Sequence, residues 1–262
     1  MKTSVLVPAF NSEGTVRQAV ESALSQSVGD LEVIVVDDGS ALPVAASLST
    51  VRDSRLRVIS HDRNRGAAAA RQTALRAARA PLISHLDADD TWQRDYLEAV
   101  LAHFEDPAVG LVYTNATLVG HPHGWTDYLR DLPYMPDPSE HPIDTFPRIA
   151  DQDPIPVLTA TARTQAVKAV GGYPRWLRLC EDYYVFLQLA AAGWRFAYVD
   201  ERLANYRWPT TASGMSYDHR GQARNLLKMW AVLAVRHPRL PGPKRQLRVR
   251  LRDELRSARG PR

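Results

Sequence analysis

Apolar and polar positions follow two different periods along the first half of the chain. Short, nearly continuous apolar runs, such as residues 31–36, in which Glu32 is the one polar residue, are typical of buried strands in a parallel sheet. Between the first two runs, apolar side chains recur at helical spacing on one face: Val16, Ala19, Val20, Ala23 and Leu24. The pattern predicts strands at residues 4–8, 31–36, 56–59, 81–86 and 109–113, and helices at residues 67–78 and 92–104.

The periodicity is lost between residues 121 and 156, where eight of the chain's eighteen prolines lie. A proline-rich connection of this length is usually a functional loop or a disordered segment. Regular structure is expected again from residue 157, with helices at residues 164–170 and 183–192 and strands at residues 194–199 and 202–208. Gly171 and Gly172 would end the first of these helices.

Strands that alternate with helices of this length predict an α/β fold with a mainly parallel, Rossmann-like central sheet flanked by helices. Open sheets of this kind bind ligands at the carboxyl ends of their strands. Polar clusters follow the first four predicted strands, at residues 8–11, 37–40, 61–66 and 87–90. Because solvation alone does not explain four polar loops at one edge of a sheet, we expect a binding site there.

The sequence Ser-His-Leu-Asp-Ala-Asp-Asp at residues 84–90 is an apolar strand end that opens into three carboxylates. Asp87 and Asp89 are two residues apart, so an extended backbone would direct both to the same side. Like charges at this spacing favour a bound cation, and Mg²⁺ or Mn²⁺ prefers oxygen ligands that it can share with a diphosphate. The alternative is an exposed acidic turn in which Asp90 caps the following helix.

The composition is that of an ordinary globular protein, with 45% apolar and 24% charged residues in a chain of 262. Cys180 is the single cysteine, which excludes an internal disulfide and a cysteine-rich zinc site. The sequence has neither a signal-peptide pattern nor an apolar stretch of transmembrane length, so we expect a cytoplasmic protein.

The positive charge of the chain is concentrated at its end. Residues 236–262 contain ten Lys and Arg against Asp253 and Glu254, a net charge of +8, whereas the whole chain carries +4. A basic end of this kind can contact anionic lipid, which leaves open a peripheral contact with the inner face of a membrane through residues 236–262. A solvated, partly helical tail is the favoured interpretation, and no nucleic acid is expected as a partner.

Five motifs follow one another within residues 3–208. They are Ser-Val-Leu-Val-Pro-Ala-Phe-Asn at 4–11, Val-Val-Asp-Asp-Gly-Ser at 35–40, Asn-Arg-Gly at 64–66 with Arg71, Leu-Asp-Ala-Asp-Asp at 86–90, and Gly-Gly-Tyr at 171–173 with Glu181 and Asp182. Each is weak alone, but the five in register resemble the family 2 glycosyltransferases, which have the GT-A fold. The resemblance implies a nucleotide-sugar-binding half at residues 1–120, a half for the acceptor and the catalytic base at residues 121–215, and a helical basic tail at residues 216–262.

The resemblance assigns the nucleotide sugar to the loops that follow the predicted strands. The residues expected to contact it are Pro8, Ala9, Phe10, Asn11, Asp38, Asn64, Gly66, Arg71, Asp87 and Ala88. Asp38 would accept the ring N–H of the base, whereas Asp37 fits better as a turn residue. The helix after Gly66 could direct its N-terminus at phosphate, and Arg71 could add charge-assisted hydrogen bonds. A surface position on that helix suits Arg71 equally well.

The resemblance also implies a divalent metal, Mn²⁺ or Mg²⁺. Asp89 would bind it directly and Asp87 would contact the ribose and share the metal, which acts as a Lewis acid on the departing diphosphate. Many relatives complete the metal shell with a histidine in the segment that corresponds to residues 205–216, but this chain has none there. Either Asp89, the diphosphate and water suffice, or His219 reaches in. His85 is expected to pack in the core.

Asp182 is the expected general base, with Glu181 as its neighbour and substitute, at the start of a helix whose dipole favours negative charge. The alternative is an acidic pair that only stabilises the helix. The reaction that the resemblance implies is an inverting transfer of a sugar from a UDP- or dTDP-type donor to a hydroxyl of a saccharide, a lipid-linked saccharide or a small natural product.

Two other functions compete with this one. A sugar nucleotidyltransferase would need a glycine-rich basic loop after the first strand, and residues 8–11 do not form one. A non-enzymatic protein that binds nucleic acid or a membrane surface would depend on residues 236–262, and its binding would fall steeply with salt.

Overall fold

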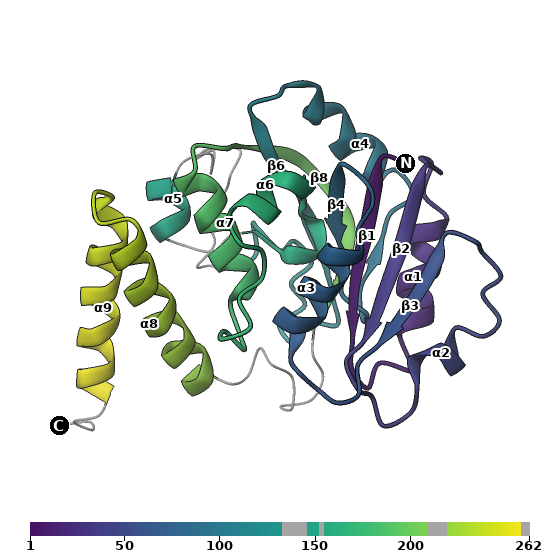
Figure 1. The fold of residues 1–262 in the computed structure, drawn as a ribbon, viewed down its shortest axis with the longest axis horizontal. Coiled ribbons are helices and arrows are strands. Elements are labelled where there is room, and N and C mark those ends of the chain that lie inside the picture. The colour runs from purple at the N-terminus through teal and green to yellow at the C-terminus, as the bar shows by residue number, and fades with distance from the viewer. Residues whose placement is uncertain (133–145, 152–154, 209–218, 258–262) are drawn as a thin grey trace.

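The computed structural model describes residues 1–132, 146–151, 155–208 and 219–257 (Figure 1). The strands are β1 Thr3–Ala9, β2 Leu31–Asp37, β3 Leu56–Ser60, β4 Leu82–His85, β5 Thr91–Trp92, β6 Val109–Val119, β7 Thr161–Arg163 and β8 Arg195–Arg207. The helices are α1 Val16–Leu24, α2 Val44–Ser47, α3 Ala67–Ala77, α4 Tyr96–Leu101, α5 Phe146–Asp151, α6 Thr164–Ala169, α7 Glu181–Ala191, α8 His219–Arg236 and α9 Pro241–Ser257, with 3₁₀ turns at Ala102–Glu105 and Val157–Thr159.

The strands form one sheet in the order β3-β2-β1-β4-β7-β6-β8-β5. The first four neighbours, β3 to β4, are all parallel, so their carboxyl ends lie at one edge, as predicted. Beyond β4 the sheet is mixed, because β7 runs antiparallel to both β4 and β6, and β5 runs antiparallel to β8. The predicted α/β architecture is confirmed, with a sheet that is mixed rather than parallel throughout.

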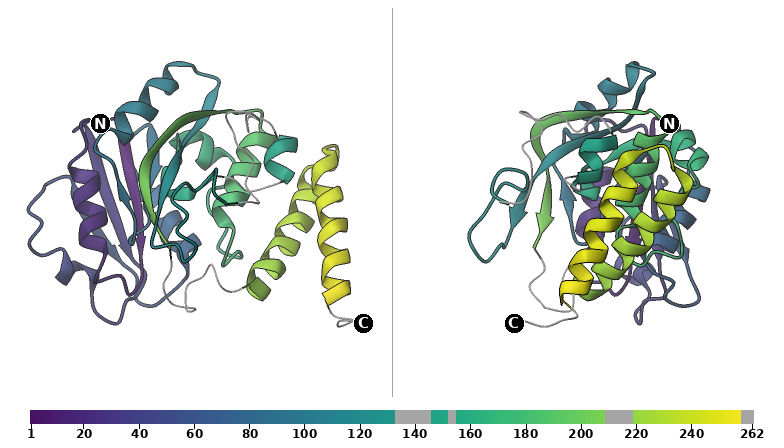
Figure 2. Two further views of the ribbon diagram at one scale, coloured as in Figure 1. Left: turned by 180° about the vertical axis from the view of Figure 1, so that it is seen from behind. Right: turned by 90° about the vertical axis from the view of Figure 1, so that its left-hand side faces the viewer.

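Two apolar layers hold the sheet between helices (Figures 1 and 2). Alternate side chains of a strand point to opposite faces, so Leu6 and Ile34 pack on the α3 side while Val5 and Val33 pack on the α1 side. Because both faces are covered, β1 and β2 are apolar almost without interruption, as expected for central parallel strands.

Several boundaries predicted from the sequence were wrong. The strand expected at residues 109–113 extends to Val119 as β6. The helix expected at residues 92–104 begins only at Tyr96, because Trp92 pairs with Ala204 in the β5–β8 ladder and its indole N–H donates to Leu158 O at 2.7 Å. The two strands expected at residues 194–199 and 202–208 are one strand, β8, whose pairing with β6 shifts register after Val199. Such an irregularity interrupts the alternation on which a strand prediction relies.

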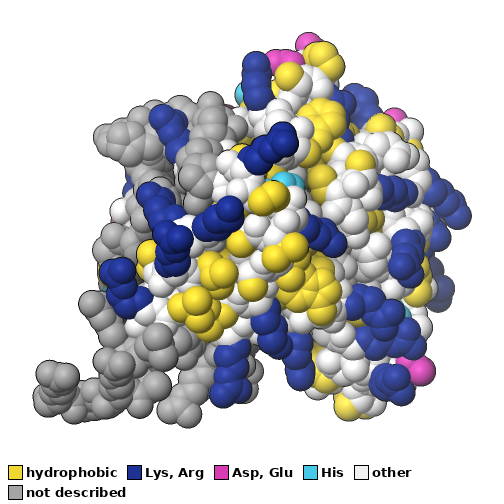
Figure 3. All heavy atoms as spheres, turned by 60° about the vertical axis from the view of Figure 1, so that its left-hand side comes forward, with side chains coloured by type: hydrophobic (Ala, Val, Ile, Leu, Met, Phe, Trp, Pro, Cys, Tyr) yellow, Lys and Arg dark blue, Asp and Glu magenta, His cyan; other side chains and the backbone are white. Residues whose placement is uncertain are grey.

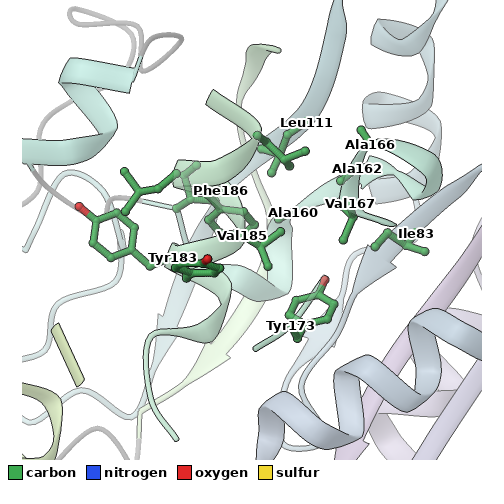
Figure 4. Close-up of a cluster of buried hydrophobic side chains, with 14 of the residues drawn as sticks. Ile83, Leu111, Ala160, Ala162, Ala166, Val167, Tyr173, Tyr183, Val185 and Phe186 are labelled. Atoms are coloured by element: carbon green, nitrogen blue, oxygen red, sulfur yellow. The ribbon is translucent and has the colours of Figure 1, made fainter. Parts of the chain in front are cut away.

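The end of the chain is an antiparallel pair of helices, α8 and α9, on the far side of α7 and α5 (Figures 1 and 2). Met229, Trp230 and Leu233 of α8 are buried in the same cluster as Tyr183 and Phe186 of α7, the latter two shown in Figure 4. The helical part of the predicted basic tail is therefore anchored on one side and not solvated all round. None of the described helices is long and apolar enough to cross a membrane.

Candidate active site

The loop after β1 is joined to the loop after β2. Asn11 follows β1 with a left-handed backbone conformation, φ 49°. Its N–H donates to Ser40 Oγ at 2.9 Å, and its Oδ1 accepts the N–H of Ala41 at 3.0 Å. Phe10 is 48% exposed at this edge, so its ring is available to stack on a planar ligand. Pro8 and Ala9 are the last two residues of β1.

Asp37 has the turn role predicted for it. Its carboxylate accepts the backbone N–H groups of Ser40 and Val44, both at 3.0 Å. Gly39, with φ 75°, allows the turn to meet the next loop, because a Cβ there would lie 2.7 Å from the backbone nitrogen of the exposed Asn64.

Asp38 is buried and holds the loop that begins α3. It accepts the N–H of Arg65 at 3.0 Å and that of Gly66 at 2.7 Å. His61 Nδ1 lies 2.6 Å from Asp38 Oδ1, and its Nε2 bonds to Thr73 Oγ1 at 2.9 Å. The sequence suggested no separate role for His61. In the structure Asp38 positions the loop that leads into α3, and its contact with a base stays a prediction.

Arg71 is the centre of a buried ionic network. Its side chain is 5% exposed, so it is not a surface residue of α3. Nη1 donates to Glu181 Oε1, and Nη2 donates to Asp87 Oδ1 at 2.6 Å. The guanidinium thus links α3, the acidic cluster after β4 and the start of α7. Within the described residues its Nε is buried without a hydrogen-bond partner.

Glu181 and Asp182, the acidic pair at the start of α7, lie in different environments. Cys180, just before it, adopts φ 63°, an uncommon conformation for a residue other than glycine. Glu181 is buried against Arg71, whereas Asp182 is partly exposed and accepts the N–H of Tyr183 at 2.8 Å. Asp182 is therefore the member of the pair that a substrate can reach.

The acidic cluster after β4 is fixed by Arg207 of β8. The backbone N–H of Arg207 donates to Asp90 Oδ1 at 2.7 Å, and its Nε donates to the carbonyl of Asp89 at 3.1 Å. The capping role considered for Asp90 was wrong, because its carboxylate binds β8 and α4 begins six residues later. Ala88 is buried, whereas Asp89 is exposed as a whole residue, although its carboxyl group is partly desolvated by the surrounding protein.

Burial and like charge raise the pKa values of four carboxyl groups around this centre. Burial, with the charges of Asp182 and Asp87, raises the pKa of Glu181 to about 7, despite Arg71. Burial also raises the pKa of Asp182. Around the acidic cluster, burial and the charge of Asp87 raise the pKa of Asp89 and raise that of Asp90 well above its ordinary value. The site carries more negative charge than its own cations neutralise.

The buried side chains of His85 and Tyr173 form a pair next to the Arg71 network. His85 Nε2 bonds to the Tyr173 hydroxyl, and its Nδ1 lies 2.6 Å from the carbonyl of Ala160. Burial lowers the pKa of His85 to about 4, so the ring is neutral at physiological pH. The prediction that His85 packs in the core is confirmed. Tyr173, labelled in Figure 4, belongs to a motif noted in the sequence, but its partner could not be inferred from spacing.

The carboxylates of the site could bind a hard divalent cation only if a bound ligand supplies further oxygen atoms to it. Within the described residues, no three His, Cys, Asp or Glu side chains are placed to hold a metal together. Asp89 offers a carboxylate whose pKa is raised first by desolvation and then by the charge of Asp87, and Mg²⁺ or Mn²⁺ commonly binds one or two carboxylates together with phosphate. Residues 209–216 and the side chain of His219, considered for the metal shell, lie outside the described part of the structure.

Aromatic side chains lie beside the acidic cluster on the β6–β8 side. Trp208 directly follows Arg207, and its backbone N–H donates to Val119 O at 2.9 Å. Its ring meets His121 edge to face at 4.2 Å between centroids, and His121 stacks on Trp125 at 4.6 Å. Sugar rings commonly lie against such surfaces, so this group is a candidate for the acceptor side.

Many curated proteins and solved structures are similar to this chain. The "Pre-mycofactocin glycosyltransferase" of Mycobacterium tuberculosis is 30% identical over 247 residues, covering 92% of this chain and 49% of the relative. The "UDP-Glc:alpha-D-GlcNAc-diphosphoundecaprenol beta-1,3-glucosyltransferase WfgD" of Escherichia coli is 30% identical over 118 residues, covering 45% and 47%. The chain thus spans about half the length of these relatives.

The solved structures support the fold. S. aureus TarS 1–349 in complex with UDP-GlcNAc matches with a TM-score of 0.73 at 19% identity, covering 96% of this chain and 72% of that one. The mannosyltransferase PcManGT from Pyrobaculum calidifontis, in complex with GDP-Man and Mn²⁺, matches with a TM-score of 0.69 at 21% identity, covering 94% and 67%. Both have the GT-A arrangement expected from the sequence.

The sequence comparison with protein families gives the assignment itself. The family described as "Glycosyl transferase family 2" matches this chain over residues 4–170. This range is more than half of the chain and contains the first four motifs. The chain therefore belongs to glycosyl transferase family 2.

Proposed function

We propose that the protein is an inverting glycosyltransferase that moves a sugar from a UDP- or dTDP-type nucleotide sugar to an acceptor hydroxyl. The observation that carries the proposal is the Arg71 network, which joins Asp87 on the donor side to the Glu181–Asp182 pair through one buried guanidinium. A direct displacement needs both groups within reach of one anomeric carbon, and this network ties them together.

The donor would lie on the edge formed by β1, β2 and β4. Phe10 would stack on the base, Asn11 and Asp38 would line its pocket, and the N-terminus of α3 after Gly66 would face the diphosphate. Asn64 and Ala88 would complete the donor contacts. Arg71 has both Nη groups engaged by carboxylates, so its main effect on the donor would be to position Asp87. Residues 1–120 would form the donor half of the domain and residues 121–215 the acceptor half.

Asp89, with Asp87 beside it, would hold Mn²⁺ or Mg²⁺ together with the diphosphate. When bound, such an ion supplies Lewis-acid stabilisation of the leaving group. The Mn²⁺ and GDP-Man in PcManGT support the use of a divalent metal and a nucleotide sugar here. The pKa values of Asp89 and Asp90 are raised by desolvation and, after it, by the charge of Asp87, and a cation bound here would offset that charge.

Asp182 would take the proton of the acceptor hydroxyl as the oxygen attacks the anomeric carbon. The bond from that carbon to the diphosphate oxygen breaks, the nucleoside diphosphate leaves with the bonding electrons, and the configuration at the carbon inverts. Glu181 would hold Arg71 and keep a second negative charge beside the base. Because burial raises the pKa of Asp182, the carboxylate is a stronger base than an exposed aspartate.

The acceptor would be a saccharide, a lipid-linked saccharide or a small natural product. WfgD, named for a diphosphoundecaprenol-linked acceptor, supports a lipid-linked saccharide. The pre-mycofactocin glycosyltransferase supports a small natural product. The aromatic group of His121, Trp125 and Trp208 would line the acceptor side.

The test measures nucleotide-sugar binding and turnover with and without Mn²⁺. Asp182→Asn should lower kcat by at least about 100-fold with little change in donor affinity, because it removes only the proton acceptor. Asp89→Asn should weaken metal-dependent donor binding. Glu105→Gln, at an exposed position, is the charge-matched control and should match the parent. Full turnover by Asp182→Asn would refute its assignment as the base, and failure to bind any nucleotide sugar would refute the proposed function.

A further inference from the structure

His61, the residue that follows β3, is a buried histidine to which the proposed mechanism gives no role. Its side chain is 7% exposed, and both of its ring nitrogens are engaged. Nδ1 lies 2.6 Å from Asp38 Oδ1, and Nε2 lies 2.9 Å from Thr73 Oγ1. Because a carboxylate only accepts hydrogen bonds, Nδ1 is the donor to Asp38. The ring therefore joins the loop after β2 to α3.

Backbone hydrogen bonds hold His61 and Asp38 at the edge where the ligand loops begin. The N–H of Asp38 donates to Ala9 O, and the N–H of His61 donates to Asp37 O, both at 2.8 Å. Ala9 ends β1, and the residue after it is the exposed Phe10. Asp38 is thus bonded to the segment that carries the ring expected to stack on the donor base.

The carboxylate of Asp38 has room for one more hydrogen-bond donor. Among the described residues it accepts three N–H groups, from His61, Arg65 and Gly66, and the N–H of Arg65 is shared between its two oxygens. A carboxylate offers about four acceptor positions. The three donors fix the plane of the carboxylate, and so they also fix the direction of the position that remains. The side chain is only 3% exposed, so bulk water has little access to that position.

We propose that His61 determines which base the donor site accepts, by holding Asp38 in this orientation. This role of His61 rests on the proposed function, in which Asp38 lines the base pocket. Uracil and thymine carry a ring N–H at the position where cytosine has an unprotonated ring nitrogen. The remaining position on Asp38 accepts that N–H. With cytosine two acceptors would face each other, and this repulsion rejects the wrong base. His61 acts through Asp38, so it is a positioning residue.

A purely structural role for His61 predicts a different result. If His61 only stabilised the loop that leads into α3, its loss would weaken all nucleotides equally, because that loop would face the diphosphate that they share. If it orients Asp38, its loss weakens UDP and relieves the rejection of CDP. The ratio of the two affinities therefore separates the two roles.

The same ratio removes the effect of non-specific charge. Figure 3 shows many Lys and Arg side chains on the face turned toward α8 and α9, and such a surface attracts any nucleoside diphosphate. UDP and CDP carry the same phosphate charge, so this attraction cancels when their affinities are compared.

The experiment is isothermal titration of the full chain with UDP and with CDP, both in the presence of Mn²⁺. The parent should bind UDP at least about tenfold more tightly than CDP. His61→Asn keeps an amide N–H near the position of Nδ1 and should keep that ratio. His61→Gln extends its amide toward Thr73 and leaves Asp38 without this donor, so the ratio should fall by at least about fivefold. His61→Phe should lower it as much, and His103→Gln, at an exposed position, should leave it unchanged.

Each outcome decides for or against this role of His61. A parent that binds neither nucleotide would refute the UDP-type donor of the proposed function, whereas a parent that binds UDP and CDP equally would overturn only the base specificity. Equal weakening of both nucleotides in His61→Gln would show a structural role and overturn the proposal. Thermal melting identifies any variant that does not fold. If His61→Phe is one, His61→Asn and His61→Gln still decide, because each keeps one of the two hydrogen bonds.

Discussion

At the scale of single residues, the site is governed by one buried guanidinium and the carboxylates around it. Burial alone disfavours a charged arginine, but Asp87 and Glu181 outweigh that cost and raise the pKa of Arg71. Removing one partner of such a buried group typically costs 3–5 kcal/mol, because the other charges are left uncompensated. Arg71 is thus as much a structural requirement of the site as a chemical one.

Glu181 should make the stability of the protein depend on pH. Its pKa of about 7 in the folded state lies above the ordinary 4.5, so between these pH values the folded protein binds more protons than the unfolded chain. The free energy of unfolding should therefore fall as the pH rises from about 4.5 to 7. In Glu181→Gln the fall should be shallower, though not absent, because Asp182, Asp89 and Asp90 contribute in the same direction. Urea denaturation at pH 5 and pH 7.5 measures it.

The stability measurement on Glu181→Gln needs a control variant that removes one negative charge at a position outside the Arg71 network. Glu105→Gln, exposed on the 3₁₀ turn after α4, should keep the pH dependence of the parent. A Glu181→Gln protein whose stability falls with pH as steeply as the parent's would show that Glu181 ionises normally in the folded state.

At the scale of secondary-structure elements, Gly39 is the point at which the loop after β2 touches the loop after β3. Gly39→Ala would require φ 75° of a residue with a Cβ and would place that Cβ against the backbone of Arg63 and Asn64. The expected cost is about 1–3 kcal/mol of stability, with weaker donor binding because the Asp38-held loop must shift. Gly14→Ala is the matched control, since a Cβ there meets nothing within 4 Å. Equal donor affinity in the two variants would contradict this role.

The helices, strands and turns also show how far the structure could be predicted from the sequence. The sequence predicted residues 31–36 as a central strand because both faces of β2 are covered, and Asp37 as a turn residue because its carboxylate accepts backbone N–H groups of the segment that follows β2. Trp92 was misplaced in a helix because its strand exists only through pairing with Ala204, more than a hundred residues away. The local pattern of apolar and polar residues contains no information about a pairing partner so far away in the sequence.

The candidate site shows the same limit. The motifs placed Asp87 and Asp89 in a loop after a strand and Asp182 at the start of a helix, and the resemblance supplied their roles. The sequence could not show that Arg71 is buried, because its two partners lie 16 and 110 residues away. Nor could it show that Tyr173 bonds to His85, or that Arg207 fixes the acidic cluster. These contacts depend on how distant elements pack.

At the scale of the whole molecule, the donor nucleotide and the metal should bind as one unit. Asp89 is exposed and has an elevated pKa, and the described residues supply no complete metal shell, so each ligand would complete the site for the other. We expect Mn²⁺ to increase the affinity for UDP by at least about tenfold, and UDP to increase the affinity for Mn²⁺ by the same factor. Isothermal titration in both orders measures the two factors.

The pH dependence of the coupling between Mn²⁺ and UDP tests whether Asp89 is the residue that binds the metal. Because a raised pKa leaves more of Asp89 protonated as the pH falls, protons should compete with Mn²⁺, and the enhancement should be smaller at pH 5.5 than at pH 7.5. In Asp89→Asn the enhancement should be lost at both pH values, while weak metal-free binding of UDP through the β1 and β2 loops remains. An Asp89→Asn protein that keeps the full Mn²⁺ effect would place the metal on other groups, and Asp87→Asn would then be the variant to measure.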